Sequence, residues 1–158
     1  DNWKPNYPAQ PYMMFVTHAF LHGGLMHLTV NMITRWSLGH AVLKQVRQRV
    51  LIVVDTLSAL GGGIGFALLA ESVRPMVGAS GALFGLLGAV LVWEFKDSRT
   101  DRAALWDLTR VVALVAALNL LLWWAMDGQL AWQAHFGGFV AGGISALFMA
   151  RSKEKQPA

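Results

Sequence analysis

The sequence predicts an all-α membrane protein, folded as a compact bundle of helices that cross the bilayer several times. Hydrophobic residues make up 55% of the 158 residues, only 14% are charged, and the mean hydropathy is +0.45. A soluble domain usually carries about 25% charged residues. The few charges are also absent from long stretches, which is the pattern of membrane-spanning helices. At this length a single domain is expected.

Five apolar segments carry this prediction, because each approaches the ~20 residues that a helix needs to cross a bilayer. They cover Gly23–Gly39, Val50–Ala70, Met76–Phe95, Leu108–Met126 and Ala131–Ala150. The first is the least apolar, since it contains His27, Asn31 and Arg35. A soluble helical bundle, which is the alternative, would need polar faces at the helical period. Segments two to five show almost none.

The positive charges predict the orientation of the bundle. Those that follow segments one, three and five are Lys44, Arg47, Arg49, Lys96, Arg99, Arg102, Arg151, Lys153 and Lys155. The opposite side has only Lys4 and Arg74. By the positive-inside rule the first group is cytoplasmic. We therefore expect an external loop over residues 1–22, the five-helix bundle over 23–150 and a cytoplasmic tail over 151–158. An external start without a signal sequence also leads us to expect a further transmembrane helix upstream.

Two residues of catalytic type lie at matching positions in parallel segments. Ser80 is the fifth residue of the third segment and His135 is the fifth residue of the fifth. Both side chains should therefore lie roughly 6 Å below the outer end of the bundle. A serine level with a histidine suggests a nucleophile and its base, although most serines in such runs only let helices approach closely. Phe84, one turn after Ser80, could stack on the imidazole.

Further polar residues interrupt the first two segments. His27 and Asn31 share one face of a helix, and His27 is level with Ser80. Both side chains can donate the hydrogen bonds that an acyl-transfer site needs around its oxyanion. Bonding to neighbouring helices is about equally compatible with this spacing. Arg35 and Asp55 fall at comparable depth, so we expect an ion pair between antiparallel helices.

Several patterns indicate packing or anchoring rather than chemistry. The repeats Gly81-x-x-x-Gly85 and Gly138-x-x-x-Gly142 predict closely packed helices. Tryptophans near segment ends predict an aromatic belt at the membrane interfaces. They are Trp93, Trp106, Trp123, Trp124 and Trp132.

Metal and nucleic acid are not favoured by the sequence. The basic residues lie between apolar segments rather than on one face, which argues against nucleic acid. There is no cysteine. His18 and His22 are four residues apart, but no carboxylate lies near them in the sequence, so no metal site is expected. Asp127 or Glu71 could be the acidic residue of a triad with Ser80 and His135, although the sequence does not show that either carboxylate lies near His135.

Three motifs together resemble the rhomboid family of intramembrane serine proteases. They are His22-Gly-Gly-Leu-Met-His27-Leu-Thr-Val-Asn31, Gly78-Ala79-Ser80-Gly81 and Ala134-His135-Phe-Gly-Gly138. The resemblance covers nearly the whole chain. It implies that Ser80 is the nucleophile and His135 the general base and then acid. His27 and Asn31, with the Ser80 backbone N–H, would form the oxyanion hole.

The same resemblance implies the remaining expectations. Gly78 would permit the loop that lets water and substrate reach Ser80, and Gly138 would let the fifth segment pack against the third. The family core has six helices, of which five are expected here; the Trp-Arg pair often found in its external loop is absent. The substrate would be the transmembrane helix of another protein, and no cofactor is expected.

We therefore predict an intramembrane serine endopeptidase that acts on transmembrane protein substrates in the lipid bilayer. The main alternative is an inactive rhomboid-like protein that binds transmembrane clients without cutting them. A small transporter or channel is a third reading, but its polar residues would follow a path through the bundle. The compact form without long loops suggests a bacterial inner membrane, with the active site toward the outer face.

Overall fold

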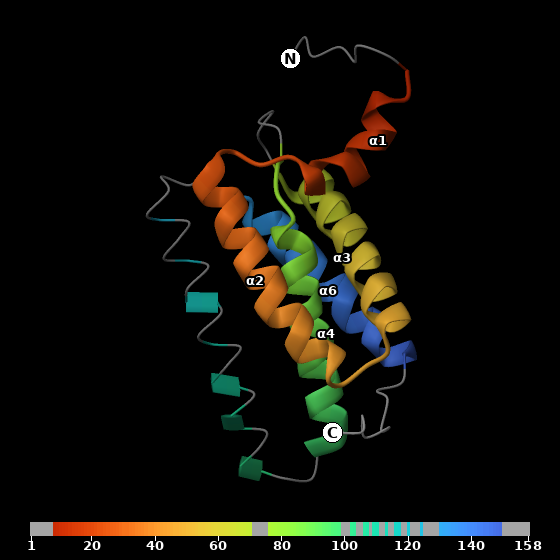
Figure 1. The fold of residues 1–158 in the computed structure, drawn as a ribbon, viewed down its shortest axis with the longest axis vertical. Coiled ribbons are helices and arrows are strands. Elements are labelled where there is room, and N and C mark those ends of the chain that lie inside the picture. The colour runs from red at the N-terminus through yellow and green to blue at the C-terminus, as the bar shows by residue number, and fades with distance from the viewer. Residues whose placement is uncertain are drawn as a thin grey trace.

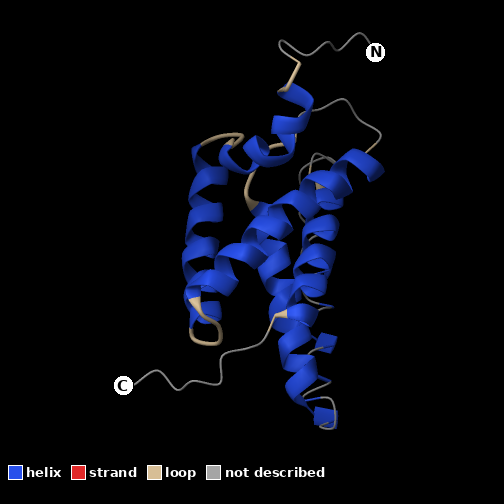
Figure 2. Ribbon diagram, turned by 90° about the vertical axis from the view of Figure 1, so that its right-hand side faces the viewer, coloured by secondary structure: helices blue, strands red, loops and turns tan. Residues whose placement is uncertain are grey.

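The computed structural model describes residues 8–70, 76–98 and 130–149, and the positions 102–103, 106–107, 109–110, 113, 116–117, 120 and 124. These residues form helices and connecting loops, with no strand among them (Figures 1 and 2). The helices are α1 (Gln10–Thr17), the 3-10 turn η1 (His18–Phe20), α2 (Leu25–Leu43), α3 (Gln48–Leu69), α4 (Ser80–Ser98) and α6 (Trp132–Phe148). The predicted all-α fold is confirmed.

Four of the five predicted segments correspond to the long helices α2, α3, α4 and α6. Their bounds differ from the prediction by at most four residues. The helix α4 begins at Ser80 rather than Met76. The reason is Gly78, whose φ of +118° cannot continue a right-handed helix. Most of the segment Leu108–Met126 lies outside the described residues, and its described positions are helical. The segment 1–22, predicted to be an external loop, contains two short helices, α1 and η1, among its described residues.

Helices α3, α4 and α6 pack backbone to backbone through their glycines. A β-carbon on Gly138 or Gly142 would overlap the carbonyl oxygen of Gly81 or Gly85 across the α4–α6 contact. A β-carbon on Gly65 of α3 would come within 2.7 Å of the Gln133 carbonyl oxygen. The close packing predicted from the two glycine repeats is therefore confirmed.

The order of these contacts gives the direction of each helix. Gly81 meets Gly138 and Gly85 meets Gly142, so the contacts advance together and α4 runs parallel to α6 (Figure 1). Gly81 also meets Gly62, while Gly85 meets the earlier residue Ser58, so α3 is antiparallel to both. Because α4 and α6 are parallel and packed in register, their first turns lie at the same end of the bundle.

An apolar cluster closes the opposite end of the bundle. It joins all four long helices through Val42, Val46, Val54, Leu86, Ala89, Trp93 and Ala146. Trp93 is only 2% exposed, and its indole Nε1 donates to the Met149 carbonyl oxygen at 3.1 Å. Interface anchoring was expected for most of the tryptophans near segment ends, and Trp93 is an exception because it is buried inside the bundle. The described tryptophans Trp106, Trp124 and Trp132 are exposed.

The outer surface of the bundle is apolar, as a lipid-facing surface should be. On α2 the exposed side chains include Met26, Ile33 and Trp36. Among the described helices, α3 alone combines the length and composition of a membrane span, with 22 residues and a mean hydropathy of 1.8. The helix α2 is less apolar, because it carries the histidines, the asparagine and the arginine discussed below.

Candidate active site

The structure brings Ser80 and His135 into hydrogen-bonding contact. Ser80 is the first residue of α4, and His135 lies in the first turn of α6. The distance from His135 Nε2 to Ser80 Oγ is 2.8 Å. Gly81 lies where the two first turns meet, and a β-carbon there would lie 3.2 Å from the Ala134 carbonyl oxygen, which is a tight contact. The equal depth expected from the sequence is thus confirmed as a direct contact.

The imidazole of His135 is held in a fixed orientation. It is buried, with 4% of the residue exposed. Phe84 stacks on it with a centroid separation of 4.2 Å and an interplanar angle of 7°, as the helical spacing predicted. An aromatic stack of this kind restricts the ring to one plane. The ring edge that carries Nε2 is therefore directed at the Ser80 hydroxyl.

Gly78 shapes the loop that precedes Ser80. Its backbone N–H donates to the His18 carbonyl oxygen at 2.9 Å, which ties this loop to η1. A β-carbon on Gly78 would lie 2.8 Å from Cε1 and 2.9 Å from Nε2 of His27. The φ of +118° and the close imidazole both require glycine at this position. The sequence led us to expect a loop at Gly78, but it did not predict the contact between Gly78 and His27.

His27 is presented to the loop from the first turn of α2. Its Nδ1 accepts a hydrogen bond from the Gly23 backbone N–H at 3.2 Å. A neutral imidazole that accepts at Nδ1 carries its proton on Nε2. That nitrogen lies on the side of Gly78. His27 therefore presents a donor beside the loop that leads to Ser80, and His22 packs edge-on against its ring at a centroid distance of 5.5 Å.

Asn31 lies one turn deeper in α2 and is buried. Its Nδ2 donates to the His27 carbonyl oxygen at 2.8 Å, within the same helix. Its Oδ1 is buried and has no hydrogen-bond partner in the described part of the chain. The side chain thus supports the turn that carries His27, and one amide N–H remains for another acceptor. The spacing did not predict this bond within α2.

The first turn of α4 supplies further donors at the serine. The leading backbone N–H groups of a helix have no acceptor within the helix, and the helix dipole makes that end partly positive. Because α4 starts at Ser80, the Ser80 backbone N–H is one of these groups. The site can therefore favour negative charge close to the serine hydroxyl.

His18 lies beside the loop that precedes Ser80, because its carbonyl oxygen accepts from the Gly78 N–H. The His18 Nδ1–H donates to the Met14 carbonyl oxygen at 3.1 Å, and burial lowers the pKa of His18. No group of three His, Cys, Asp or Glu side chains suited to a metal occurs among the described residues. Asp127 and Glu71 lie outside the described residues.

Comparison with known proteins supports the family resemblance that the three sequence motifs indicated. The family model of the Rhomboid domain matches residues 9–152. The RHOMBOID-like protein 5 of Arabidopsis thaliana is 35% identical over 129 residues, covering 78% of this chain and 39% of that protein. The RHOMBOID-like protein 6, mitochondrial, of the same plant is 32% identical over 147 residues, or 89% and 45% of the two chains.

A bacterial relative is similar over a comparable range. The Rhomboid protease GlpG of Klebsiella pneumoniae subsp. pneumoniae is 30% identical over 143 residues, covering 86% of this chain and 50% of that protein. The chain thus spans half or less of the length of these relatives. Because the family model matches nearly all of its residues, the chain belongs to the rhomboid family of polytopic helical membrane proteins.

Proposed function

We propose that this chain is an intramembrane serine endopeptidase that uses Ser80 as nucleophile and His135 as general base and acid. The observation that carries the proposal is the 2.8 Å contact between His135 Nε2 and Ser80 Oγ, on a ring held by Phe84. A hydroxyl becomes a useful nucleophile when an oriented base lies within hydrogen-bonding reach. Membership of the rhomboid family supports protease-like function in the membrane.

The proposed reaction is acyl transfer in two halves. Ser80 Oγ attacks the substrate carbonyl carbon while its proton passes to His135 Nε2. The tetrahedral oxyanion is stabilised by donors, for which we propose the Ser80 backbone N–H, His27 Nε2–H and the remaining Asn31 N–H. The C–N bond then breaks as His135 returns the proton to the leaving amine. A water molecule, deprotonated by His135, hydrolyses the acyl-enzyme and restores the serine.

The substrate we propose is the transmembrane helix of another membrane protein. Peptide bonds inside a helix are shielded by their own hydrogen bonds, so the segment must unwind before its carbonyl reaches Ser80. Cleavage is therefore expected near the outer end of the substrate helix. We also propose that this end of the bundle faces the outside, because Lys44, Arg47 and Arg49 lie at the opposite end. A bacterial inner membrane is the location we favour.

Labelling with a fluorophosphonate serine probe tests the proposal. The purified chain, in detergent and in liposomes, is compared with Ser80→Ala and His135→Ala, and we expect both variants to lose labelling. Ser145→Ala and His40→Ala are matched controls, because each side chain bonds a carbonyl of its own helix. They should label like the wild type. Cleavage of a model transmembrane substrate is then measured on the same samples.

The alternative of an inactive client-binding protein has a distinct outcome. A folded wild-type protein that neither labels nor cleaves, yet still co-purifies with a model transmembrane helix in a Ser80-independent manner, would favour it. Labelling that persists in Ser80→Ala would also reject the proposed nucleophile, because another hydroxyl would then be the activated one.

A further inference from the structure

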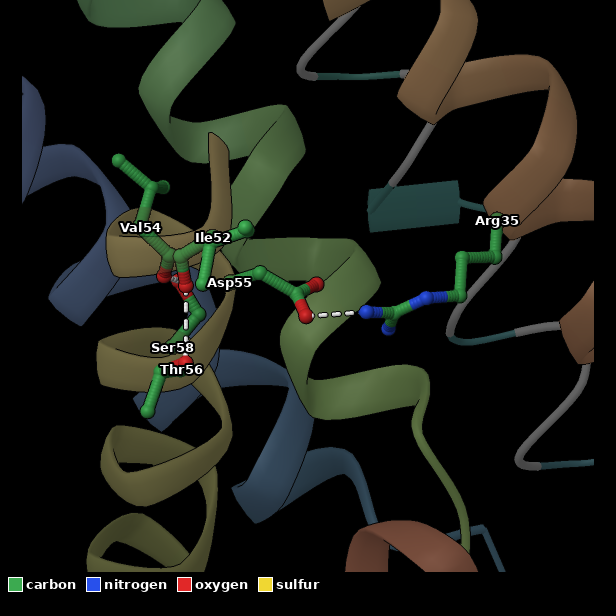
Figure 3. Close-up of polar contacts among 6 residues, drawn as sticks. All are labelled: Arg35, Ile52, Val54, Asp55, Thr56 and Ser58. Atoms are coloured by element: carbon green, nitrogen blue, oxygen red, sulfur yellow. Dashed lines mark hydrogen bonds and ion pairs between the residues drawn. The ribbon is translucent and has the colours of Figure 1, made fainter. Parts of the chain in front are cut away.

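An ion pair joins α2 to α3 away from the candidate active site. Arg35 Nη2 donates to Asp55 Oδ2 across 20 residues of sequence (Figure 3). The Asp55 side chain is 15% exposed and that of Arg35 is 43% exposed. The ion pair predicted from the matched depths of these residues is therefore confirmed. In a bilayer an ionised side chain of this kind is costly unless it is paired.

Asp55 depends on Arg35 for this pairing. Its other oxygen, Oδ1, is buried and has no hydrogen-bond partner in the described part of the chain. The hydroxyls nearest in sequence are committed elsewhere: Thr56 donates to the Ile52 carbonyl at 2.8 Å and Ser58 to the Val54 carbonyl at 2.6 Å (Figure 3). Separating Arg35 from Asp55 would therefore leave a poorly hydrated carboxylate inside the bundle.

The pair lies where α2 is otherwise weakly attached. The glycine contacts that lock α3, α4 and α6 together do not extend to Gly39 of α2, which has nothing within 4 Å of its β-position. On the inner side of the pair, Val42 belongs to the apolar cluster. Around it, the side chains of Met32, Ile33 and Trp36 are exposed. The ion pair is thus a specific polar link between the cluster and the outer turns of α2.

The residues beyond the pair are those proposed to bind the oxyanion. Asn31 is one turn above Arg35 and His27 is two turns above it, at roughly 6 Å per four residues, on the same side of the helix. Any rotation or sliding of α2 would move both donors relative to Ser80. A buried polar pair is best attested as a device that fixes register between helices.

We propose that the Arg35–Asp55 ion pair is a positioning element that sets the register of α2 against α3, and so holds His27 and Asn31 at the Ser80–His135 site. The catalytic part of this inference rests on the proposed function. The pair does not touch the reacting atoms. It acts through the donors on α2, so its loss should lower kcat and the labelling rate while leaving KM nearly unchanged.

An apolar replacement separates positioning from stability. The double variant Arg35→Met/Asp55→Leu removes both charges together, and such replacements often leave stability unchanged or higher. We expect its labelling rate to fall about 10- to 100-fold, since a displacement near 1 Å can cost that much. The charge exchange Arg35→Asp/Asp55→Arg should recover most of the rate. Wild-type labelling by the apolar variant would overturn the proposal.

A double-mutant cycle tests whether the effect passes through the donors. In the Asn31→Ala background the apolar replacement should slow labelling less than it does in the wild type, because one of the two donors that it displaces is already absent. Full additivity of the two effects would count against the proposal. The matched control is Arg110→Ala, which removes an ion pair to Asp107 whose two side chains are exposed. It should label like the wild type.

A distance measurement tests the register without catalysis. The chain has no cysteine, so spin labels can be attached at Val30→Cys on α2 and Val140→Cys on α6, both at exposed positions. We expect a single narrow distance distribution for the parent, a broader or shifted one for the apolar variant, and recovery in the charge exchange. An unchanged distribution would refute the register role. Failure of the wild type to label would count only against the proposed protease activity.

Discussion

Replacing Gly78 by alanine should damage the site through two separable effects. The φ of +118° is unfavourable for any residue with a β-carbon and costs on the order of 1–3 kcal/mol. The new β-carbon would also lie 2.8 Å from His27 Cε1. Carbon atoms in contact prefer about 3.5–4.0 Å, so the imidazole or the loop must move by roughly 0.7–1.2 Å. A displacement of that size can lower a rate about 10²-fold.

The measurement combines thermal unfolding with the fluorophosphonate labelling rate per folded molecule. Gly24→Ala is a close control, because Gly24 has a φ of +146° and nothing within 4 Å of its β-position. It should lose stability and keep its labelling rate, whereas Gly78→Ala should lose both. In a His27→Ala background Gly78→Ala should slow labelling only slightly. If Gly24→Ala and Gly78→Ala label equally well, the argument that Gly78 holds His27 in place fails.

Three further predictions concern packing around the site. Phe84→Ala should slow labelling up to about tenfold, because a stack worth ~0.5–1.5 kcal/mol no longer orients His135, and Phe84→Tyr should retain most of the rate. Gly142→Ala should lower the unfolding temperature by several degrees because its methyl would overlap a backbone carbonyl of α4, whereas Gly143→Ala, with its nearest atom 3.5 Å away, should fold normally. Trp93→Phe should cost about 1–3 kcal/mol of unfolding free energy in a denaturant titration, since the indole hydrogen bond is lost and the smaller phenyl ring leaves part of the buried space unfilled; an unchanged midpoint would show that neither the bond nor the packing of the indole contributes.

The sequence predicted most of the bundle because its signals are local. Long apolar segments specify helices, and the positive charges specified that the third and fifth segments run the same way. Once they are parallel, the constant rise per residue brings Ser80 level with His135. Phe84 followed from the spacing of one turn, and the glycine repeats gave the close approach of α4 and α6. Each of these inferences concerns either one helix or a single pair of helices.

The features that sequence reasoning missed depend on tertiary placement. Trp93 lies near a segment end, which suggested an interface anchor, but it is buried and donates to the carbonyl oxygen of Met149, just after α6. The contact of Gly78 with His27 joins residues from two segments, and a positive φ leaves no mark on the sequence beyond the glycine itself. The helix α1 has only 8 residues. A helix that short gives too few turns for a clear hydrophobic period.

The candidate site combines two residues on tightly packed helices with two residues on a helix that packs less closely. Ser80 and His135 lie on α4 and α6. The backbones of these two helices are in direct contact at their glycines, which opposes movement of one helix against the other. His27 and Asn31 lie on α2. This helix contacts the other helices through His27 beside Gly78, through the Arg35–Asp55 ion pair, and through the apolar cluster at the far end of the bundle. Changes in α2 should therefore alter the proposed oxyanion stabilisation before they disturb the serine–histidine contact. Variants in α2 are expected to keep a hydrogen-bonded Ser80 and still react slowly, whereas variants in the glycine contacts should lose the folded bundle first.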